Sequence, residues 1–110
     1  MNSAGRISLR GGILITRKRQ WDVGAWYLYL LECVDGALYT GIAIDPLARY
    51  EKHRAGKGAK YTRANRPVRL IGAIAYPDRG SATRAEIAFK KLKAAEKRAR
   101  IGDFAAVTAG

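Results

Sequence analysis

Five side chains of this sequence belong to types that act as acids, bases, anion clamps or metal ligands. They are Tyr29, Tyr39, Arg49, His53 and Glu86. Arg49 and His53 are four residues apart, so on a helix they lie on one face, about one turn apart. A guanidinium can hold a phosphate with two parallel hydrogen bonds, and a carboxylate suits a hard cation such as Mg²⁺. Together these groups are what a phosphodiesterase that uses one metal ion would need.

Each of these residues also has an ordinary structural interpretation. The two tyrosines stand in segments of strand-like composition, where aromatic side chains commonly pack a core. Arg49 can be a solvated helix residue, and His53 a helix histidine satisfied by backbone or water. Glu86 lies just outside the apolar stripe of its expected helix, about 60° past the edge of that stripe. It can therefore be an exposed glutamate paired with Lys90 one turn later.

A tyrosine that acts as a base has a further requirement. The pKa of free tyrosine is about 10, so neighbouring cations must lower it before the hydroxyl can accept a proton at neutral pH. Arg49 and the lysines of the 57–60 segment are the candidates for supplying that field.

The charge of the chain favours a polyanionic partner. Lys and Arg number 21 against 9 Asp and Glu, which gives a formal net charge of +12. Nucleic acid is the commonest partner of such a surface. The segment 56–69 intersperses cations with an aromatic residue, a pattern typical of phosphate contacts combined with base stacking. Its candidate nucleic-acid-binding residues are Lys57, Lys60, Tyr61, Arg63 and Arg66.

Several classes of protein are disfavoured by composition. The single cysteine, Cys33, excludes an internal disulfide and a cysteine-cluster zinc site, and one histidine excludes a His-pair metal site. No apolar run approaches the ~20 residues needed to span a bilayer, so no membrane is expected as a partner. We therefore expect a reduced, cytoplasmic setting for the protein.

Residues 26–33 and 37–43 have the composition of two strands of a hairpin, separated by the turn signal Asp35-Gly36. A two-residue loop would put Tyr29 and Tyr39 on opposite faces of the sheet, because side chains alternate along a strand. A three-residue loop, with Gly36 in the left-handed conformation, would pair Cys33 with Ala37 and put both tyrosines on one face. If both tyrosines act at one site, the three-residue loop is required.

The remaining elements follow from end signals and periodicity. Asp45, Pro46 and Gly56 predict a helix that runs to about residue 55. A basic loop and a third strand over 68–76 follow. Ser81 is the expected cap of one long helix that reaches about Arg100, with an apolar face at Ala85, Ala88, Phe89, Leu92, Ala95 and Ala99. We expect residues 1–25 to be an extension of uncertain order, 26–100 the working domain, and 101–110 a frayed tail.

Taken in order, these residues resemble the GIY-YIG nuclease superfamily, in particular its small stand-alone bacterial (YhbQ-like) members. Tyr27-Leu28-Tyr29 stands where the first triplet of that family lies, and Tyr39-Thr40-Gly41 stands where the second lies. The Arg49 and His53 pair, the glycine-rich basic loop and Glu86 follow in the same order. The resemblance covers roughly residues 26–100. The first triplet lacks its glycine, and no residue clearly matches the C-terminal asparagine that some members use.

The resemblance implies an α+β fold with a three-stranded antiparallel sheet flanked by helices, in the order β-β-α-β-α. It also implies hydrolysis of DNA phosphodiester bonds with one divalent metal ion, Mg²⁺ or Mn²⁺. By position, Glu86 would bind the metal, Tyr29 would be the base that activates water, and Arg49 would stabilise the pentacoordinate phosphate. Tyr39 and His53 would position water or phosphate.

Two functions from different classes fit this sequence. The first is a metal-dependent DNA endonuclease that selects DNA structure or damage rather than a long sequence. The second is a basic nucleic-acid-binding module that keeps the fold without catalysis. Loss of cleavage on substitution of Glu86, with DNA affinity retained, would distinguish the first from the second.

Overall fold

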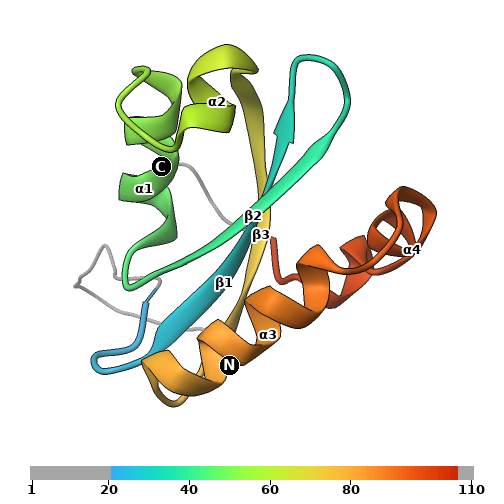
Figure 1. Ribbon diagram of the computed structural model, residues 1–110. Coiled ribbons are helices and arrows are strands. Elements are labelled where there is room, and N and C mark those ends of the chain that lie inside the picture. The colour runs from blue at the N-terminus through green and yellow to red at the C-terminus, as the bar shows by residue number, and fades with distance from the viewer. Residues whose placement is uncertain (1–20, 107–110) are drawn as a thin grey trace, which may run out of the picture.

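The structure, a computed structural model, describes residues 21–106. It contains the strands β1 (Trp26–Cys33), β2 (Leu38–Ala43) and β3 (Pro67–Tyr76). The helices are α1 (Pro46–Arg54), α2 (Lys60–Ala64), α3 (Arg79–Lys90) and α4 (Ala94–Ala99), followed by the 3₁₀ turn η1 (Ile101–Asp103). The three strands form one antiparallel sheet in the order β2-β1-β3 (Figure 1). The predicted α+β class and three-stranded antiparallel sheet are confirmed.

The hairpin between β1 and β2 has the three-residue loop. The Cys33 N–H donates to the carbonyl of Ala37, and the Gly36 N–H donates to the carbonyl of Cys33. Gly36 has a φ of 84°, in the region that side chains disfavour. Leu31 therefore pairs with Tyr39, and Tyr29 pairs with Gly41. Because side chains alternate along each strand, Tyr29 and Tyr39 lie on the same face of the sheet.

Each face of the sheet is covered by a different helix (Figure 1). On one face, Tyr27, Tyr29 and Leu31 form a buried cluster, and α1 packs against it through Tyr50. On the other face, Leu28 and Leu30 of the same strand pack with residues that include Phe89 and Ala85 of α3. The central strand β1 is buried on both sides, which explains why its sequence is almost continuously apolar. The strand β2 is an edge strand of the sheet.

The two long helices begin with aspartate caps. The Asp45 carboxylate accepts from the Ala48 N–H at 3.0 Å, and Gly56 has a φ of 78° just beyond the end of α1, as predicted. At α3 the cap is Asp78, whose carboxylate accepts from the Ser81 N–H at 2.7 Å. The expectation that Ser81 caps this helix is therefore wrong: the cap lies three residues earlier, and the helix begins at Arg79.

The single long helix expected over 81–100 is instead two helices with a break at residues 91–93. Glu96 accepts from the Lys93 backbone N–H at 2.8 Å and so caps α4 separately. The Arg98 side chain then donates to the carbonyl of Gly36, at the hairpin turn. Only Phe89 among the six predicted apolar-face residues is buried; Ala88, Ala95 and Ala99 are exposed. Helical spacing predicts an apolar face along this segment, but α4 instead contacts the distant β1–β2 hairpin through Arg98.

The segment after α4 packs against the sheet, so the expectation of a frayed tail is wrong for residues 101–106. Phe104 is buried and its ring meets that of Phe89 edge to face, with the centroids 5.5 Å apart. Ala105 exchanges two backbone hydrogen bonds with Ala73 of β3. Residues 107–110 and the first twenty residues of the predicted extension lie outside the described part of the chain. The division of the chain at residues 25 and 100 stays a prediction.

Within residues 21–106, no helix combines the length and apolar character needed to cross a bilayer. The cytoplasmic location stays a prediction.

Candidate active site

A buried chain of hydrogen bonds links β1, α1 and α2. The Tyr29 hydroxyl lies 3.0 Å from Nε2 of His53, and Nδ1 of His53 lies 2.7 Å from the hydroxyl of Thr62. The Thr62 hydroxyl in turn donates to the carbonyl of Ala59 at 2.9 Å. Tyr29 is 2% exposed, His53 1% and Thr62 0%. Each member of the chain therefore finds its polar partners within the protein.

Two glycines leave the space that this chain of hydrogen bonds occupies. A Cβ atom on Gly41 would lie 2.7 Å from Cζ of Tyr29 and closer still to its hydroxyl. A Cβ atom on Gly58 would lie 2.7 Å from Cε1 of His53 and closer still to Nδ1. The glycine of the second triplet and the second glycine of the basic loop thus let the phenol and the imidazole pack directly on the backbone.

Tyr39 joins this buried chain to the charged groups of α3. Its ring meets that of His53 edge to face, with the centroids 5.4 Å apart. The Lys90 ammonium lies 5.6 Å from the centre of the same ring, which is a cation–π distance. Lys90 also forms an ion pair with Glu86 at 3.2 Å. The helix α3 lies against the edge strand β2. Lys90 and Glu86 therefore reach past this edge to the face of the sheet that carries Tyr29 and Tyr39.

The charges of Arg49 and Glu86 both act on the Tyr29 hydroxyl. Burial raises the pKa of Tyr29 well above its ordinary value, and the neighbouring Tyr39 raises it further. Arg49 lowers this pKa, as expected for a nearby cation, but its effect is smaller than that of burial, and Glu86 opposes it. Without a further cation, the Tyr29 hydroxyl is therefore protonated at neutral pH.

His53 is held in its neutral form. Burial lowers the pKa of His53, and the positive charge of Arg49, one turn earlier on α1, lowers it further. A neutral imidazole carries one proton and one free lone pair, so it can donate through one nitrogen and accept through the other.

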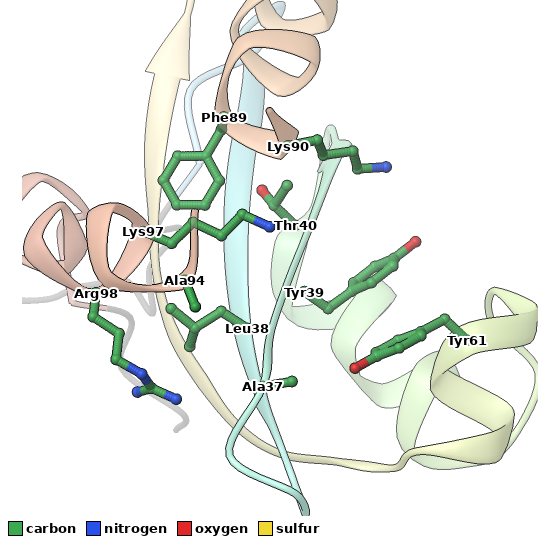
Figure 2. Close-up of a pocket in the computed structure, with 10 residues that line it drawn as sticks. All are labelled: Ala37, Leu38, Tyr39, Thr40, Tyr61, Phe89, Lys90, Ala94, Lys97 and Arg98. Carbon is green, nitrogen blue, oxygen red and sulfur yellow. The ribbon is translucent and has the colours of Figure 1, made fainter. Parts of the chain in front are cut away.

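A groove of about 520 Å³ opens over the edge strand beside Tyr39. Its floor is apolar, with Leu38 and Phe89, and the Lys97 side chain extends over it (Figure 2). Lys90 lies at the side of the groove nearer Tyr39 (Figure 2). The rings of Tyr39 and Tyr61 form one wall; they are stacked with their centroids 5.9 Å apart and their planes 10° from parallel (Figure 2). Ala37, Thr40, Ala94 and Arg98 complete the lining.

The five predicted nucleic-acid-binding residues are all exposed, on α2 and the segments beside it: Lys57, Lys60, Tyr61, Arg63 and Arg66. Within residues 21–106, the salt bridges involve none of these four cations. Tyr61 belongs to both this surface and the groove, so the two basic regions are continuous. We refer to the five residues as the α2 surface.

The structure brings all five candidate catalytic and metal-binding residues to one region. His53 contacts both Tyr29 and Tyr39. Lys90 links Glu86 to the Tyr39 ring, and Arg49, one turn before His53 on α1, lowers the pKa of Tyr29. Thr62 was not singled out from the sequence, and neither were the packing roles of Gly41 and Gly58. A threonine in a basic loop carries no signal of its own, because its role depends on which side chain the fold brings against it.

The family model for the GIY-YIG catalytic domain matches residues 25–99 of this chain. This match spans the three strands, α1, α2, α3 and α4, together with all the candidate residues described above. The chain therefore belongs to the GIY-YIG family.

The similar proteins are small and come from varied bacteria. A UPF0213 protein of Cupriavidus pinatubonensis is 51% identical over 72 residues, which is 66% of this chain and 80% of that protein. A UPF0213 protein of Streptococcus sanguinis is 55% identical over 65 residues, 59% of this chain and 75% of that protein. The solution structure of the protein EF2693 from E. faecalis is 37% identical with a TM-score of 0.54, covering 76% of this chain and 90% of that one.

Proposed function

We propose that this protein is a metal-dependent endonuclease that hydrolyses phosphodiester bonds of DNA. The observation that carries the proposal is the convergence described above: a tyrosine hydroxyl bonded to a neutral histidine, flanked by a second tyrosine, with a guanidinium and a carboxylate acting on the same hydroxyl. Membership of the GIY-YIG family supports a nuclease in general.

In this proposal each residue has one task. Tyr29 takes a proton from the attacking water, and Arg49 holds the scissile phosphate and offsets the charge that develops on it. Tyr39 and His53 position the water and the phosphate. The exposed guanidinium of Arg49 is available to an incoming phosphate, whereas Tyr29 is held in place by its buried contacts. Groups fixed before the substrate arrives stabilise a transition state without reorganising.

The residues present fit one hard divalent cation, Mg²⁺ or Mn²⁺, shared with the DNA. Mg²⁺ is commonly held by one or two carboxylates together with waters and substrate phosphates. Glu86 supplies one carboxylate, which already faces a cation, the ammonium of Lys90. Within the described part of the chain no three His, Cys, Asp or Glu side chains form a metal cluster, so the other ligands would be waters and phosphate oxygens. Such an ion would neutralise charge on the phosphate.

The groove and the α2 surface are the proposed DNA contacts. Lys97 and Lys90 of the groove and the four cations of the α2 surface can pair with phosphates, and Tyr61, 45% exposed, offers a ring to a base. Because the two regions meet at Tyr61, a strand bound along them would pass beside Tyr39. Selection of DNA structure or damage is part of this proposal.

One observation favours the alternative of a non-catalytic DNA-binding module. Glu86 is paired with Lys90 at 3.2 Å, which is the contact that an unused helix glutamate would make. A binding module would keep its DNA affinity when Glu86 is replaced. With about six phosphate contacts, either protein should lose affinity with salt at a slope of about −5 in a log–log plot, so salt alone does not separate the two.

Glu86→Gln is the decisive variant. It removes the carboxylate charge but keeps the size of the side chain. Glu51→Gln is the matched control, because Glu51 is also a helix glutamate in a short-range ion pair, with Arg54. Both are compared with the wild-type protein on branched, flapped, nicked and duplex DNA, with Mg²⁺ and with Mn²⁺. We expect Glu86→Gln to lower the cleavage rate by about 10²-fold or more, with DNA affinity and unfolding unchanged.

Two results would contradict the proposal. If the wild-type protein cuts none of these substrates with either metal, it is not the proposed endonuclease. If it cuts them and Glu86→Gln cuts as fast as Glu51→Gln, Glu86 is not the metal ligand.

A further inference from the structure

The three short contacts around His53 can be satisfied in one way only. Tyr29 and Thr62 each bring one hydroxyl proton, and neutral His53 brings one N–H. The contacts to be made are Tyr29 to Nε2 at 3.0 Å, Nδ1 to Thr62 at 2.7 Å, and Thr62 to the Ala59 carbonyl at 2.9 Å. The three protons serve all three contacts only if every hydrogen bond is donated in the same direction along the series Tyr29, His53, Thr62 and Ala59.

The direction is set at the Ala59 end. A carbonyl oxygen can only accept, so the single proton of the Thr62 hydroxyl is committed to Ala59. The Thr62 oxygen must then accept from Nδ1–H of His53, and Nε2 is left with its lone pair towards Tyr29. The opposite tautomer would place two acceptors, the Thr62 oxygen and the Ala59 carbonyl, 2.9 Å apart with no proton between them.

We propose that Thr62 is a positioning residue that holds neutral His53 as the Nδ1–H tautomer, so that Nε2 accepts the hydroxyl proton of Tyr29. No other side chain of residues 21–106 forms a hydrogen bond to Nδ1. The backbone of Gly58 covers that side of the ring, and His53 is 1% exposed, which keeps bulk water from taking the place of the hydroxyl. The lowered pKa of His53 supports the neutral form.

The consequence rests on the proposed nuclease function. Because the Tyr29 hydroxyl keeps its own proton at neutral pH, it can take a proton from water only if it releases one in the same step. As an O–H bond of the attacking water breaks, its proton goes to the Tyr29 oxygen, and the Tyr29 proton passes to Nε2 of His53. The imidazole becomes an imidazolium that still donates Nδ1–H to Thr62. In the other tautomer Nε2 already carries a proton and cannot receive it.

The titratable groups that face His53 come from three elements: Tyr29 from β1, Tyr39 from β2, and Arg49 from its own helix. None of them contacts Nδ1, so none can replace Thr62 in choosing the tautomer.

The experiment uses the fact that His53 is the only histidine of the chain. In ¹⁵N-labelled full-length protein at about pH 7.5, above the ordinary histidine pKa, long-range ¹H–¹⁵N correlation assigns the proton to one ring nitrogen without ambiguity. We expect Nδ1 to be protonated in the wild type and in Thr62→Ser, and the Nε2–H form to appear in Thr62→Val. Thr83→Val, which removes a threonine hydroxyl from α3, is the control and should leave the His53 signals unchanged.

The wild-type spectrum alone can overturn the proposal, even if Thr62→Val fails to fold. If wild-type His53 is protonated at Nε2, the tautomer assignment is wrong. If Thr62→Val folds and keeps the Nδ1–H form, Thr62 is not what selects it.

Cleavage kinetics test the consequence separately. We expect kcat to fall by about 10²-fold in Thr62→Val, with KM unchanged and the rate restored in Thr62→Ser. An Nδ1–H tautomer in a wild-type protein that cuts no DNA would support the assignment of Thr62 and overturn the proposed nuclease function instead.

Discussion

Gly41 is the position where the smallest chemical change should disturb the candidate site most directly. A Cβ atom there would lie 2.7 Å from Cζ of Tyr29, whereas ordinary van der Waals contact begins at 3.4 Å. In Gly41→Ala the phenol must therefore move by at least the difference, 0.7 Å. Tyr29 is buried between β1 and α1 and cannot turn into solvent, so the movement is made against packed neighbours.

The expected cost has two parts. Overpacking of a well-packed core costs about 1–3 kcal/mol, and breaking the 3.0 Å bond to His53 would leave buried polar groups unpaired. The reduced freedom of the unfolded chain returns about 0.4–1 kcal/mol. We expect Gly41→Ala to lower the free energy of unfolding by about 1–5 kcal/mol in urea titration. A displacement of this size should also slow cleavage by about 10²-fold.

Gly102→Ala is the matched control, since a Cβ atom there meets nothing within 4 Å. It should change neither the unfolding free energy nor the cleavage rate appreciably. If Gly41→Ala has the stability of the wild type and leaves the His53 ring signals in place, then the phenol does not pack on Gly41, and the geometry derived for Tyr29 is wrong.

Two further predictions concern the core and the histidine. Phe104→Ala should cost about 3–5 kcal/mol of unfolding free energy, because Phe104 is buried against Phe89. Val23→Ala is the control, because this side chain is 87% exposed, and it should leave the free energy of unfolding almost unchanged. If Phe104→Ala changes the free energy of unfolding as little as Val23→Ala does, the segment after α4 does not pack against the sheet. The pKa of His53 is lowered in the folded protein, so below the ordinary histidine value of about 6.5 the unfolded chain binds a proton that the folded chain does not. The free energy of unfolding should therefore fall as the pH drops from about 6.5 through the folded-state pKa of His53. In His53→Gln the free energy of unfolding should depend less on pH over this range. The same pH dependence in both proteins would contradict a lowered pKa of His53.

Local sequence signals were sufficient for the elements that carry the site. The Asp35-Gly36 turn left only two hairpin registers open, and the requirement that both tyrosines act together selected the one that the structure has. Asp45 and Gly56 marked both ends of α1 because helix capping depends on neighbouring residues along the chain. The positions of Arg49 and His53 on one helix face followed from that.

The break after α3 was missed because one of its two causes is distant in the sequence. Lys90 to Lys97 contains neither glycine nor proline, so local propensity favours a continuous helix. The cap at Glu96 is local, but the contact of Arg98 with the carbonyl of Gly36 forms only once the hairpin is in place. The apolar stripe predicted over the second half of the helix failed for the same reason.

By itself, the sequence determined which chemical groups are present, their order along the chain, and which of them share a face of a helix or, for a given hairpin register, a face of the sheet. These properties follow from alternation along strands, helical spacing and short-range capping. Only the tertiary structure decided the environment of each group. Burial outweighs the cation that was expected to lower the pKa of Tyr29, and Thr62 meets His53 because α1 and α2 pack together. Solvation and hydrogen-bond direction depend on what surrounds an atom, and those surroundings come from residues far apart in the chain.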